Sequence, residues 1–282
     1  GRRCSAAVAH LRPALARGNV TLLTKSQVLK INMTNNSVSG VTFKHRGEIR
    51  SVEASKEVIL SGGAINSPHL LMLSGIGPEK HLKEHGIDVN VDLPGVGQNL
   101  QDHSCVILQY ACKKSFPIHK VNQPHRKLAT GIKWVFTKKG IGASNIWEAG
   151  GLIRSSSKAA YPDIQYHFGP VGFEYEDNKI SLLQAFAIHV DQLRPRSRGE
   201  VTLKSADPLE KPLMTFNYLQ HPEDLAEMLC GVKKARELIS QQAFDEYRGE
   251  ELIPGSKVES DDDLVKFIRD VAETDYHPSC SC

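Results

Sequence analysis

The sequence lacks a long hydrophobic run and a large excess of either charge. Within its 282 residues no apolar stretch approaches the ~20 residues of a membrane-spanning helix, so we expect no transmembrane segment. The formal net charge is only +3, which is too small to favour nucleic acid or an anionic surface as a partner. The sequence is 40% hydrophobic and 24% charged, which is the composition of an ordinary globular protein with a buried core.

Cysteine is also scarce, with six residues in the chain. Their spacing forms no disulfide framework, so we expect reduced and mostly buried thiols. The run His277-x-x-Cys280-x-Cys282 offers three potential ligands. A zinc site usually needs a fourth ligand at matching spacing, and none is evident, so no metal is expected.

Two further features are missing from the chain. It has no Gly-x-Gly-x-x-Gly element, the usual phosphate-binding fingerprint of dinucleotide-binding proteins. It also begins at Gly1 without a methionine and shows no signal or transit peptide. We expect a piece of a longer protein.

The first hundred residues indicate short strands around a strand–turn–helix unit. A helix is expected over 5–17, and Val58–Gly63 is expected to be a buried strand running into a glycine turn. A helix should follow, with Asn66 or Ser67 as its N-cap and Pro68 at its first position. This geometry can bring backbone N–H groups to a phosphate, although an ordinary strand–helix junction looks the same. Further strands are expected at 20–23, 28–31, 38–43, 49–52 and 87–93, with a short helix at 78–85.

After the Gly95–His103 loop the pattern changes to that of an antiparallel sheet packed with helices. Helices near 222–240 and 260–272 carry apolar residues at helical spacing and should cover a core. Another helix is expected near 122–137. The expected strands are 105–111, 148–153, 163–168, 182–190, 200–204 and 213–216.

Two glycine-bearing segments lie close together: Gly63–Gly77, and Leu93–His103 with the sequence Leu-Pro-Gly-Val-Gly-Gln-Asn-Leu-Gln-Asp-His. Together they resemble the paired signatures of the glucose–methanol–choline (GMC) flavin oxidoreductases. Further matching segments are spread over the chain, at Ala54–Pro68, Pro162–Phe168, Arg248–Ser256 and Tyr276–Pro278. The resemblance covers the second half of a family member and is strongest to the members that dehydrogenate choline.

The resemblance implies a fold that combines α/β with α+β. Residues 1–104 would form the later part of a Rossmann-like FAD-binding domain. Residues 105–282 would form a substrate domain built on an antiparallel sheet with helices, of the family's C-terminal type from about 195. The family's Gly-x-Gly-x-x-Gly element would precede Gly1, and the last strand and helix of the flavin domain would follow Cys282.

The cofactor implied is FAD. The resemblance places the main chain of Val28 against the adenine, although an apolar strand residue is ordinarily part of a core. The turn at Gly62, Gly63 and Ala64 would lie near the dinucleotide. The loop residues Asn99, Asp102 and His103 would lie beside the flavin, although Asn and Asp in a turn commonly hold the loop's own backbone.

The resemblance makes His277, in Tyr276-His277-Pro278, the candidate catalytic base. Oxidation of an alcohol removes a hydroxyl proton and a carbon-bound hydride. Imidazole accepts and holds a proton near neutral pH, while the flavin takes the hydride. Many relatives continue with Gly-Thr shortly after this histidine, whereas Cys280 stands here.

A quaternary ammonium has no hydrogen-bond donor, so it is bound by aromatic faces and a carboxylate. The resemblance implies substrate-binding roles for Trp147, Glu148, His167, Phe173 and Tyr276. The same aromatic residues would also suit a core. Some choline-oxidising relatives carry a glutamate where this chain has Tyr110-Ala111, so the anionic partner is left open, with Glu148 as the candidate.

The function that the resemblance implies is FAD-dependent oxidation of choline to betaine aldehyde. Two alternatives stay open. One is a GMC dehydrogenase for another small alcohol, such as a sugar or aryl alcohol, and the other is a non-catalytic fragment without bound FAD. The family also implies a quinone-type electron acceptor and a mitochondrial, inner-membrane-associated location.

Overall fold

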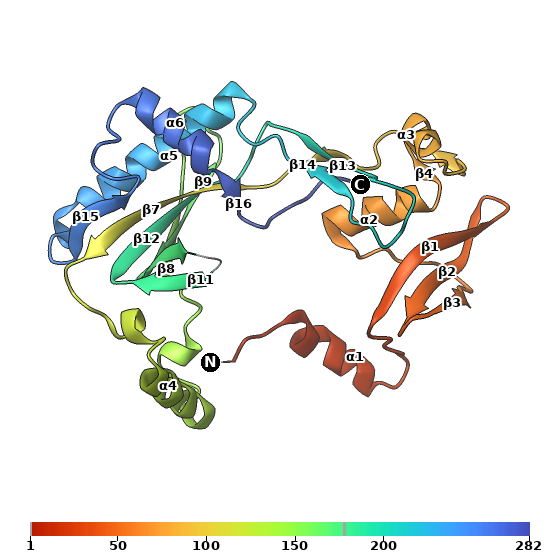
Figure 1. Ribbon diagram of the computed structural model, residues 1–282, viewed down its shortest axis with the longest axis horizontal. Helices are drawn as coiled ribbons and strands as arrows, with labels where there is room; N and C mark the ends of the chain where they lie inside the picture. The colour runs from red at the N-terminus through yellow and green to blue at the C-terminus, as the bar shows by residue number, and fades with distance from the viewer. Residues whose placement is uncertain (1, 177–178) are drawn as a thin grey trace. The chain divides into compact units, whose positions relative to one another are not determined.

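The computed structural model describes residues 2–176 and 179–282, and its chain divides into two compact units (Figure 1). Unit 1 contains His103–Arg196 and Tyr218–Tyr276, and unit 2 contains Cys4–Asp102, Ser197–Asn217 and His277–Cys282. Each unit is therefore assembled from segments that are distant in the sequence. The mixed fold of antiparallel sheets and helices confirms the expected fold class.

Unit 1 is built on a six-stranded antiparallel sheet with the order β15-β7-β12-β9-β8, in which β16 also pairs with β7. The central strand β12 pairs with β7 on one side and β9 on the other. The strands are β7 (Ser104–Cys112), β8 (Ala149–Ile153), β9 (Ile164–Gly169), β12 (Ala185–Gln192), β15 (Arg248–Ile253) and β16 (Glu273–Thr274).

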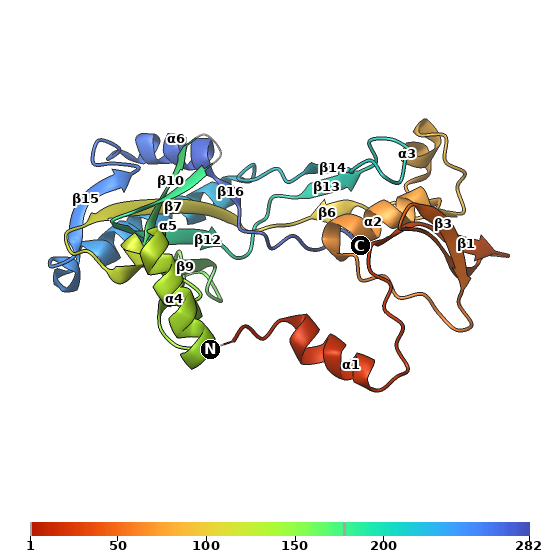
Figure 2. The ribbon, with the colours of Figure 1, turned by 60° about the horizontal axis from the view of Figure 1, so that its bottom comes forward.

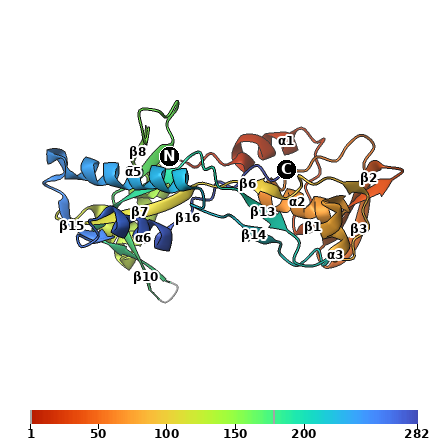
Figure 3. The same ribbon diagram turned by 90° about the horizontal axis from the view of Figure 1, so that it is seen from above.

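The two faces of this sheet differ in character. One face is apolar and packs against α5 (Pro222–Ser240) and α6 (Asp261–Val271), which lie in front of the strands in Figure 3. Its core includes Leu108, Ile188, Val232 and Ile268, all at most 1% exposed. Because neighbouring residues of a strand point to opposite faces, the other face carries the intervening residues. The registers place these residues side by side: Cys105, Ile107, Gln109, Gln165, His167, His189 and Asp191.

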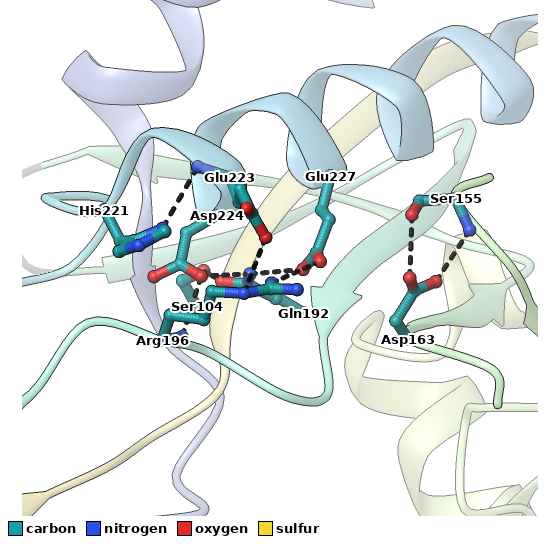
Figure 4. Close-up of polar contacts among 9 residues, drawn as sticks. All are labelled: Ser104, Ser155, Asp163, Gln192, Arg196, His221, Glu223, Asp224 and Glu227. Atoms are coloured by element: carbon teal, nitrogen blue, oxygen red, sulfur yellow. Dashed lines mark hydrogen bonds and ion pairs between the residues drawn. The ribbon is translucent and has the colours of Figure 1, made fainter. Parts of the chain in front are cut away.

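A polar network fixes the end of β12 to the first turn of α5 (Figure 4). The Asp224 carboxylate accepts hydrogen bonds from the Gln192 side chain at 3.0 Å and from the backbone N–H of Arg196 at 2.8 Å. The Arg196 guanidinium pairs with Glu223 and Glu227. The chain therefore leaves the sheet at a defined point, because the buried Asp224 accepts hydrogen bonds from both Gln192 and Arg196.

The remaining elements of unit 1 lie outside this sheet. Strands β10 (Gly172–Glu176) and β11 (Lys179–Leu183) form an antiparallel hairpin. Helix α4 (Pro124–Thr137) begins at a proline and ends at Lys138, which has a positive φ of 55°. Single 3₁₀ turns occupy Pro117–Lys120, Ile141–Ala143 and Gln242–Phe244.

Unit 2 contains a three-stranded antiparallel sheet of β1 (Ser26–Thr34), β2 (Ser37–His45) and β3 (Glu48–Glu53), seen at its edge in Figure 2. A short helical segment precedes the sheet, with a π-helical turn at Ala7–Leu11 and α1 at Arg12–Ala16. A register shift between Val28 and Lys30 marks a β-bulge in β1. Bulges bend a strand and interrupt its ladder of hydrogen bonds, so the backbone next to Val28 is only partly used by the sheet.

Helix α2 (Gly63–Leu73) begins earlier than the sequence suggests. Its N-cap is Gly62, and Pro68 lies inside the helix, so the expected caps Asn66 and Ser67 and the first-position proline are wrong. A proline at 68 cannot donate to the carbonyl four residues earlier, at Ala64. The Ser281 hydroxyl supplies the missing donor to that carbonyl. A tertiary contact therefore compensates for the hydrogen bond that is lost when a proline lies inside the helix.

The rest of unit 2 packs around α2. Strands β13 (Gly199–Thr202), β14 (Leu213–Thr215) and β6 (Gln98–Leu100) form a second three-stranded sheet. The short strands β4 (Ile76–Gly77) and β5 (Val91–Asp92) pair in parallel on either side of α3 (Glu79–Glu84). Six buried residues form the core: Met72, Leu82, Val96, Leu100, Val201 and Leu203.

Two segments expected to be strands are not strands in the structure. Residues 20–23 and 58–61 have no regular structure, and Ile59 is 76% exposed. A strand needs a neighbour to accept and donate its hydrogen bonds, and neither segment pairs with a strand among the described residues. The alternation over 87–93 yields only the two-residue strand β5. The helices expected near 78–85, 122–137, 222–240 and 260–272 are confirmed within a few residues.

Candidate functional site

Unit 2 contains a cavity of about 460 Å³ beside the bulged strand β1 and the first turns of α2. Val28 and Gly62 both line it, so the structure brings together two residues that the sequence analysis placed against one dinucleotide. A Cβ on Gly62 would lie 3.0 Å from the backbone nitrogen of Ser67, so the turn is close-packed and suits glycine. The other lining residues are Ser26, Gln27, Ile59, Leu60, Ser61, Asn66, Ser67, His69, Leu70, Leu73 and Pro208.

The lining of this cavity suits a flat, polar-edged ring system. Strand backbone and small side chains form one wall, and Ile59, Leu60 and Leu70 supply apolar surface. Burial lowers the pKa of His69, which disfavours its charged form. A cavity with this lining could hold an adenine ring, and among its residues Val28 is the one that the resemblance assigns to the adenine.

A second cavity of about 520 Å³ borders the N-terminal turn of α2. Gly63 and Ala64 line it from the helix, and residues 278–282 line it from the end of the chain. Gly63 has a φ of +75°, a conformation that favours glycine, and a Cβ there would meet nothing within 4 Å. The N–H groups of a helix's first turn have no partners within the helix, so this cavity faces donors suited to an anionic group.

The end of the chain pairs with the Gly95–His103 loop through an isolated β-bridge. Gln101 and Ser279 exchange two backbone hydrogen bonds of 3.0 and 2.8 Å, and the N–H of Gly97 donates to the carbonyl of Ser281 at 2.9 Å. Ser281 in turn bonds the Ala64 carbonyl of α2. The segment that follows the candidate base is thus tied to both the loop and the helix.

Two of the loop's predicted cofactor residues hold the segment that contains His277. The Asp102 carboxylate, 4% exposed, accepts the backbone N–H of His277 at 2.8 Å. The Asn99 amide, at a φ of +65°, donates to the carbonyl of Cys280 at 3.3 Å. The His277 side chain is exposed. Both polar side chains therefore fix the backbone of the candidate base and leave its imidazole accessible.

In unit 1, Trp147 and His167 meet on the polar face of the large sheet. Their ring centroids lie 6.0 Å apart, and the Trp147 ring also stands edge-on to His189 at 4.4 Å. A Cβ on Gly169 would lie 2.8 Å from the Trp147 ring, so the indole packs directly on the backbone of β9. The structure thus brings two of the predicted substrate residues together.

A buried carboxylate lies behind these rings. Asp191 has no exposed surface, and one of its oxygens lies 3.3 Å from Nδ1 of His167. Burial raises the pKa of Asp191 to about 7, an effect that the Cys105 thiol opposes. Burial lowers the pKa of His189 to about 4, with His167 adding to the effect, so His189 is neutral near pH 7. Burial and the neighbouring Asp191 raise the pKa of the Cys105 thiol, which excludes a thiolate there.

Phe173 is held separately, through its backbone. The Gln109 side chain accepts the N–H of Phe173 at 2.7 Å and donates to its carbonyl at 3.0 Å. Both residues line a cavity of about 510 Å³, and neither Trp147 nor His167 is among its lining residues. The predicted substrate residues therefore fall into two groups on unit 1.

The other predicted residues have more peripheral places. Glu148 is exposed and accepts a hydrogen bond from the Ser144 hydroxyl. Tyr276 is 84% exposed, and the carbonyl of His103 accepts the N–H of Asp275 at 3.0 Å. The sequence analysis missed Gln109, His189 and Asp191, because nothing in a single strand indicates which residues of other strands will lie beside it.

Comparison with known proteins decides the family. Two profiles described as GMC oxidoreductase match the chain, one over residues 1–105 and the other over residues 195–282. This chain belongs to the GMC oxidoreductase family. The expected resemblance is confirmed.

The GMC chain is similar to curated proteins over its whole length. It is 43% identical to the oxygen-dependent choline dehydrogenase of Staphylococcus saprophyticus and 45% identical to that of Brucella ovis, in each case over 282 residues. The chain covers 50% and 51% of these two relatives, so it spans about half of their length. Both relatives are bacterial, and the comparisons therefore give no support for a mitochondrial location.

Solved structures share the fold. A formate oxidase from Aspergillus oryzae, in a study of FAD modification, superposes with a TM-score of 0.84 at 26% identity, covering 93% of this chain and 51% of its own. Pyridoxine 4-oxidase from Mesorbium loti superposes with a TM-score of 0.81 at 27% identity, covering 100% of this chain and 51% of its own. Among the described residues no helix has the length and apolarity needed to cross a membrane.

Proposed function

We propose that the complete protein containing this GMC chain oxidises choline to betaine aldehyde with FAD. The observation that carries the proposal is the 42–45% identity, over essentially the whole chain, to proteins named choline dehydrogenase. The surface of unit 1 where Trp147 and His167 meet offers aromatic faces to a small organic alcohol.

FAD would accept the substrate's hydride when bound. The chain's own residues would hold it in two places. The cavity with Val28 and Gly62 suits the adenosine part, and the first turn of α2 at Gly63 and Ala64 suits a phosphate. The loop residues Asn99, Asp102 and His103 remain candidates for the flavin end.

His277 would take the hydroxyl proton of the substrate. Its imidazole is exposed while its backbone N–H is fixed by the buried Asp102, which is the arrangement that a positioned base requires. In unit 1, Trp147, His167 and Phe173 would bind the substrate, and Gln109 would keep the Phe173 backbone in place. Glu148 and Tyr276 remain candidates at the exposed edge.

A different alcohol is the second candidate. Structures that share the fold include pyridoxine 4-oxidase and an aryl-alcohol oxidase, so the fold itself is compatible with ring alcohols. The electron acceptor is a separate question: the resemblance suggests a quinone-type acceptor, whereas the curated relatives are named oxygen-dependent. Measuring oxygen consumption against reduction of a soluble quinone, with the same substrate, separates the two.

The test uses the protein encoded by the complete reading frame, which is purified and examined by visible spectroscopy. We expect a flavin spectrum that choline bleaches under anaerobic conditions, and slower bleaching by benzyl alcohol, pyridoxine or glucose. If one of these alcohols bleaches the flavin faster than choline does, that alcohol is the preferred substrate and the choline assignment is wrong. A complete protein without flavin, or with flavin that no alcohol reduces, would favour the non-catalytic alternative.

A further inference from the structure

The cavity beside Phe173 has the lining of a pocket for an organic cation. It measures about 510 Å³ and lies on the polar face of the sheet in unit 1, where Ile107 and Gln109 of β7 form its floor. Apolar side chains from the hairpin, β15 and the end of α6 complete most of the wall: Phe173, Leu183, Leu252, Ile253 and Val271. A surface of this kind suits methyl groups and offers them no hydrogen bond.

Two carboxylates also border this cavity, those of Glu174 and Glu273. The residue Glu273 belongs to β16 and stands opposite Cys105 of β7. Residues opposite each other in a sheet point to the same face, so Glu273 shares the face of Ile107 and Gln109. No hydrogen bond or ion pair to the Glu273 carboxylate exists within 2–176 and 179–282. In the part of the chain that the structure describes, its charge is therefore not compensated by an ion pair.

The segment in which some choline-oxidising relatives carry a glutamate, Tyr110-Ala111 in this chain, cannot supply this charge. Ala111 stands opposite Ala185 in β12. The neighbouring Tyr110 is 6% exposed and points to the apolar face, where its hydroxyl donates to Glu251. Glu251 is itself paired with Arg236, so that carboxylate is already compensated.

We propose that Glu273 is the carboxylate that recognises the substrate's quaternary ammonium in the cavity beside Phe173. This assignment rests on the proposed function and adds the group that selects a cationic alcohol over a neutral one. A trimethylammonium group interacts with a carboxylate only through charge, because it has no N–H to donate. Backbone pairing to β7 fixes Glu273, whereas Glu174 lies on the hairpin strand next to Phe173.

The experiment uses the complete enzyme and two substrates of the same shape. Choline is compared with 3,3-dimethylbutan-1-ol, in which carbon replaces the quaternary nitrogen, by measuring kcat/KM for flavin reduction. We expect Glu273→Gln to lower kcat/KM for choline by about 10- to 100-fold, since an unscreened charge pair near a protein surface is worth several RT. The value for the neutral alcohol should change by less than about twofold.

Two further variants test whether the preference for choline depends on the negative charge at Glu273. Glu273→Asp retains the charge and should recover part of the preference for choline. Glu174→Gln, at the same cavity, should lower that preference less than Glu273→Gln does. Equal losses for both substrates in Glu273→Gln, or a larger loss of preference in Glu174→Gln, would overturn the assignment. A wild-type enzyme that does not oxidise choline would instead refute the proposed function.

Discussion

The imidazole of His277 is exposed on a backbone that the chain holds in place. If it is the base, His277→Ala in the complete enzyme should slow flavin reduction by choline by roughly 10²–10⁴-fold, the usual size of a general-base contribution. Anaerobic stopped-flow spectroscopy measures this rate directly. Flavin content should stay close to that of the wild type, because the fixing contact is made by the backbone N–H and not by the ring.

A matched control for this change is His221→Ala, at the N-cap of α5 in unit 1. This histidine stabilises a helix end through the N–H of Glu223 and has no proposed part in the chemistry. We expect the rate of flavin reduction to be nearly unchanged. A near-wild-type rate in His277→Ala would show that another group takes the proton.

Asp191 makes stability depend on pH through its burial. Its folded-state pKa is raised to about 7, while an unfolded Asp titrates near ~3.9. The folded state therefore holds the proton more tightly. The stabilising contribution of Asp191 is fully present below about pH 4 and is lost as the pH rises through about 7. His189 acts in the opposite sense, because its pKa is lowered to about 4, so its contribution is lost as the pH falls from ~6.5 through that value.

The two effects oppose each other below about pH 6.5, and above it only Asp191 still titrates. Asp191→Asn should therefore stabilise the protein at pH 8 by roughly 1–3 kcal/mol, and the gain should shrink toward pH 6. Unfolding monitored at pH 6, 7 and 8 measures the difference, with the exposed Asp262→Asn as the control. A gain that is the same at all three pH values would show that the ionised carboxylate is not the source of the instability.

At the scale of elements, helix α2 depends on a donor from the end of the chain. The Ala64 carbonyl would be left without a helical partner by Pro68, and the Ser281 hydroxyl bonds it instead. We expect Ser281→Ala to cost about 1 kcal/mol in the complete protein, the usual worth of such a bond. In a Pro68→Ala background the new N–H can bond Ala64, so the cost of Ser281→Ala should fall to less than about half.

Chemical unfolding of the four proteins of this cycle gives the coupling energy. Ser279→Ala is the control, since Ser279 pairs with Gln101 through backbone atoms alone. Two equal costs of Ser281→Ala, with and without Pro68, would mean that the hydroxyl stabilises the segment in some other way.

The elements that the sequence predicted well are those whose side chains follow one clear period. β7, β9 and β12 alternate between a core face and a polar face, and α5 and α6 repeat apolar residues at helical spacing. β15 was missed because Arg-Gly-Glu-Glu-Leu-Ile has no such alternation. The prediction of a strand at 58–61 is wrong because an apolar run does not indicate whether a neighbouring strand pairs with it.

At the scale of the whole molecule, the site depends on pairings between distant segments. Motifs in the sequence pointed to Gly62 and His277, because each lies in a contiguous signature, and the family resemblance assigned Val28. Gln109, Asp191 and Glu273 became visible only from the registers of β7 with β12 and β16, which a single sequence does not fix. The assembly of unit 2 from three separate segments was unpredictable for the same reason.

Binding of the cofactor also depends on the whole molecule, and this chain alone supplies only some of the contacts. It has cavities suited to parts of FAD, yet its sequence contains no Gly-x-Gly-x-x-Gly cradle for the pyrophosphate. We therefore expect the purified 282-residue chain to retain little flavin, measured as the ratio of visible to ultraviolet absorbance. A yellow product with near-stoichiometric FAD would contradict this expectation, and the complete protein provides the positive control.

The hydroxyl of Ser281 joins the last residues of the chain to the helix that borders both cavities of unit 2. Any ligand that steadies α2 must then also steady the segment containing His277, and the dependence is reciprocal because it is a coupling free energy. Occupancy of the two cavities and the order of the segment containing the candidate base His277 would rise and fall together. The rate at which a carboxypeptidase trims the 282-residue chain, compared with and without an excess of added FAD, would report on whether those cavities are filled.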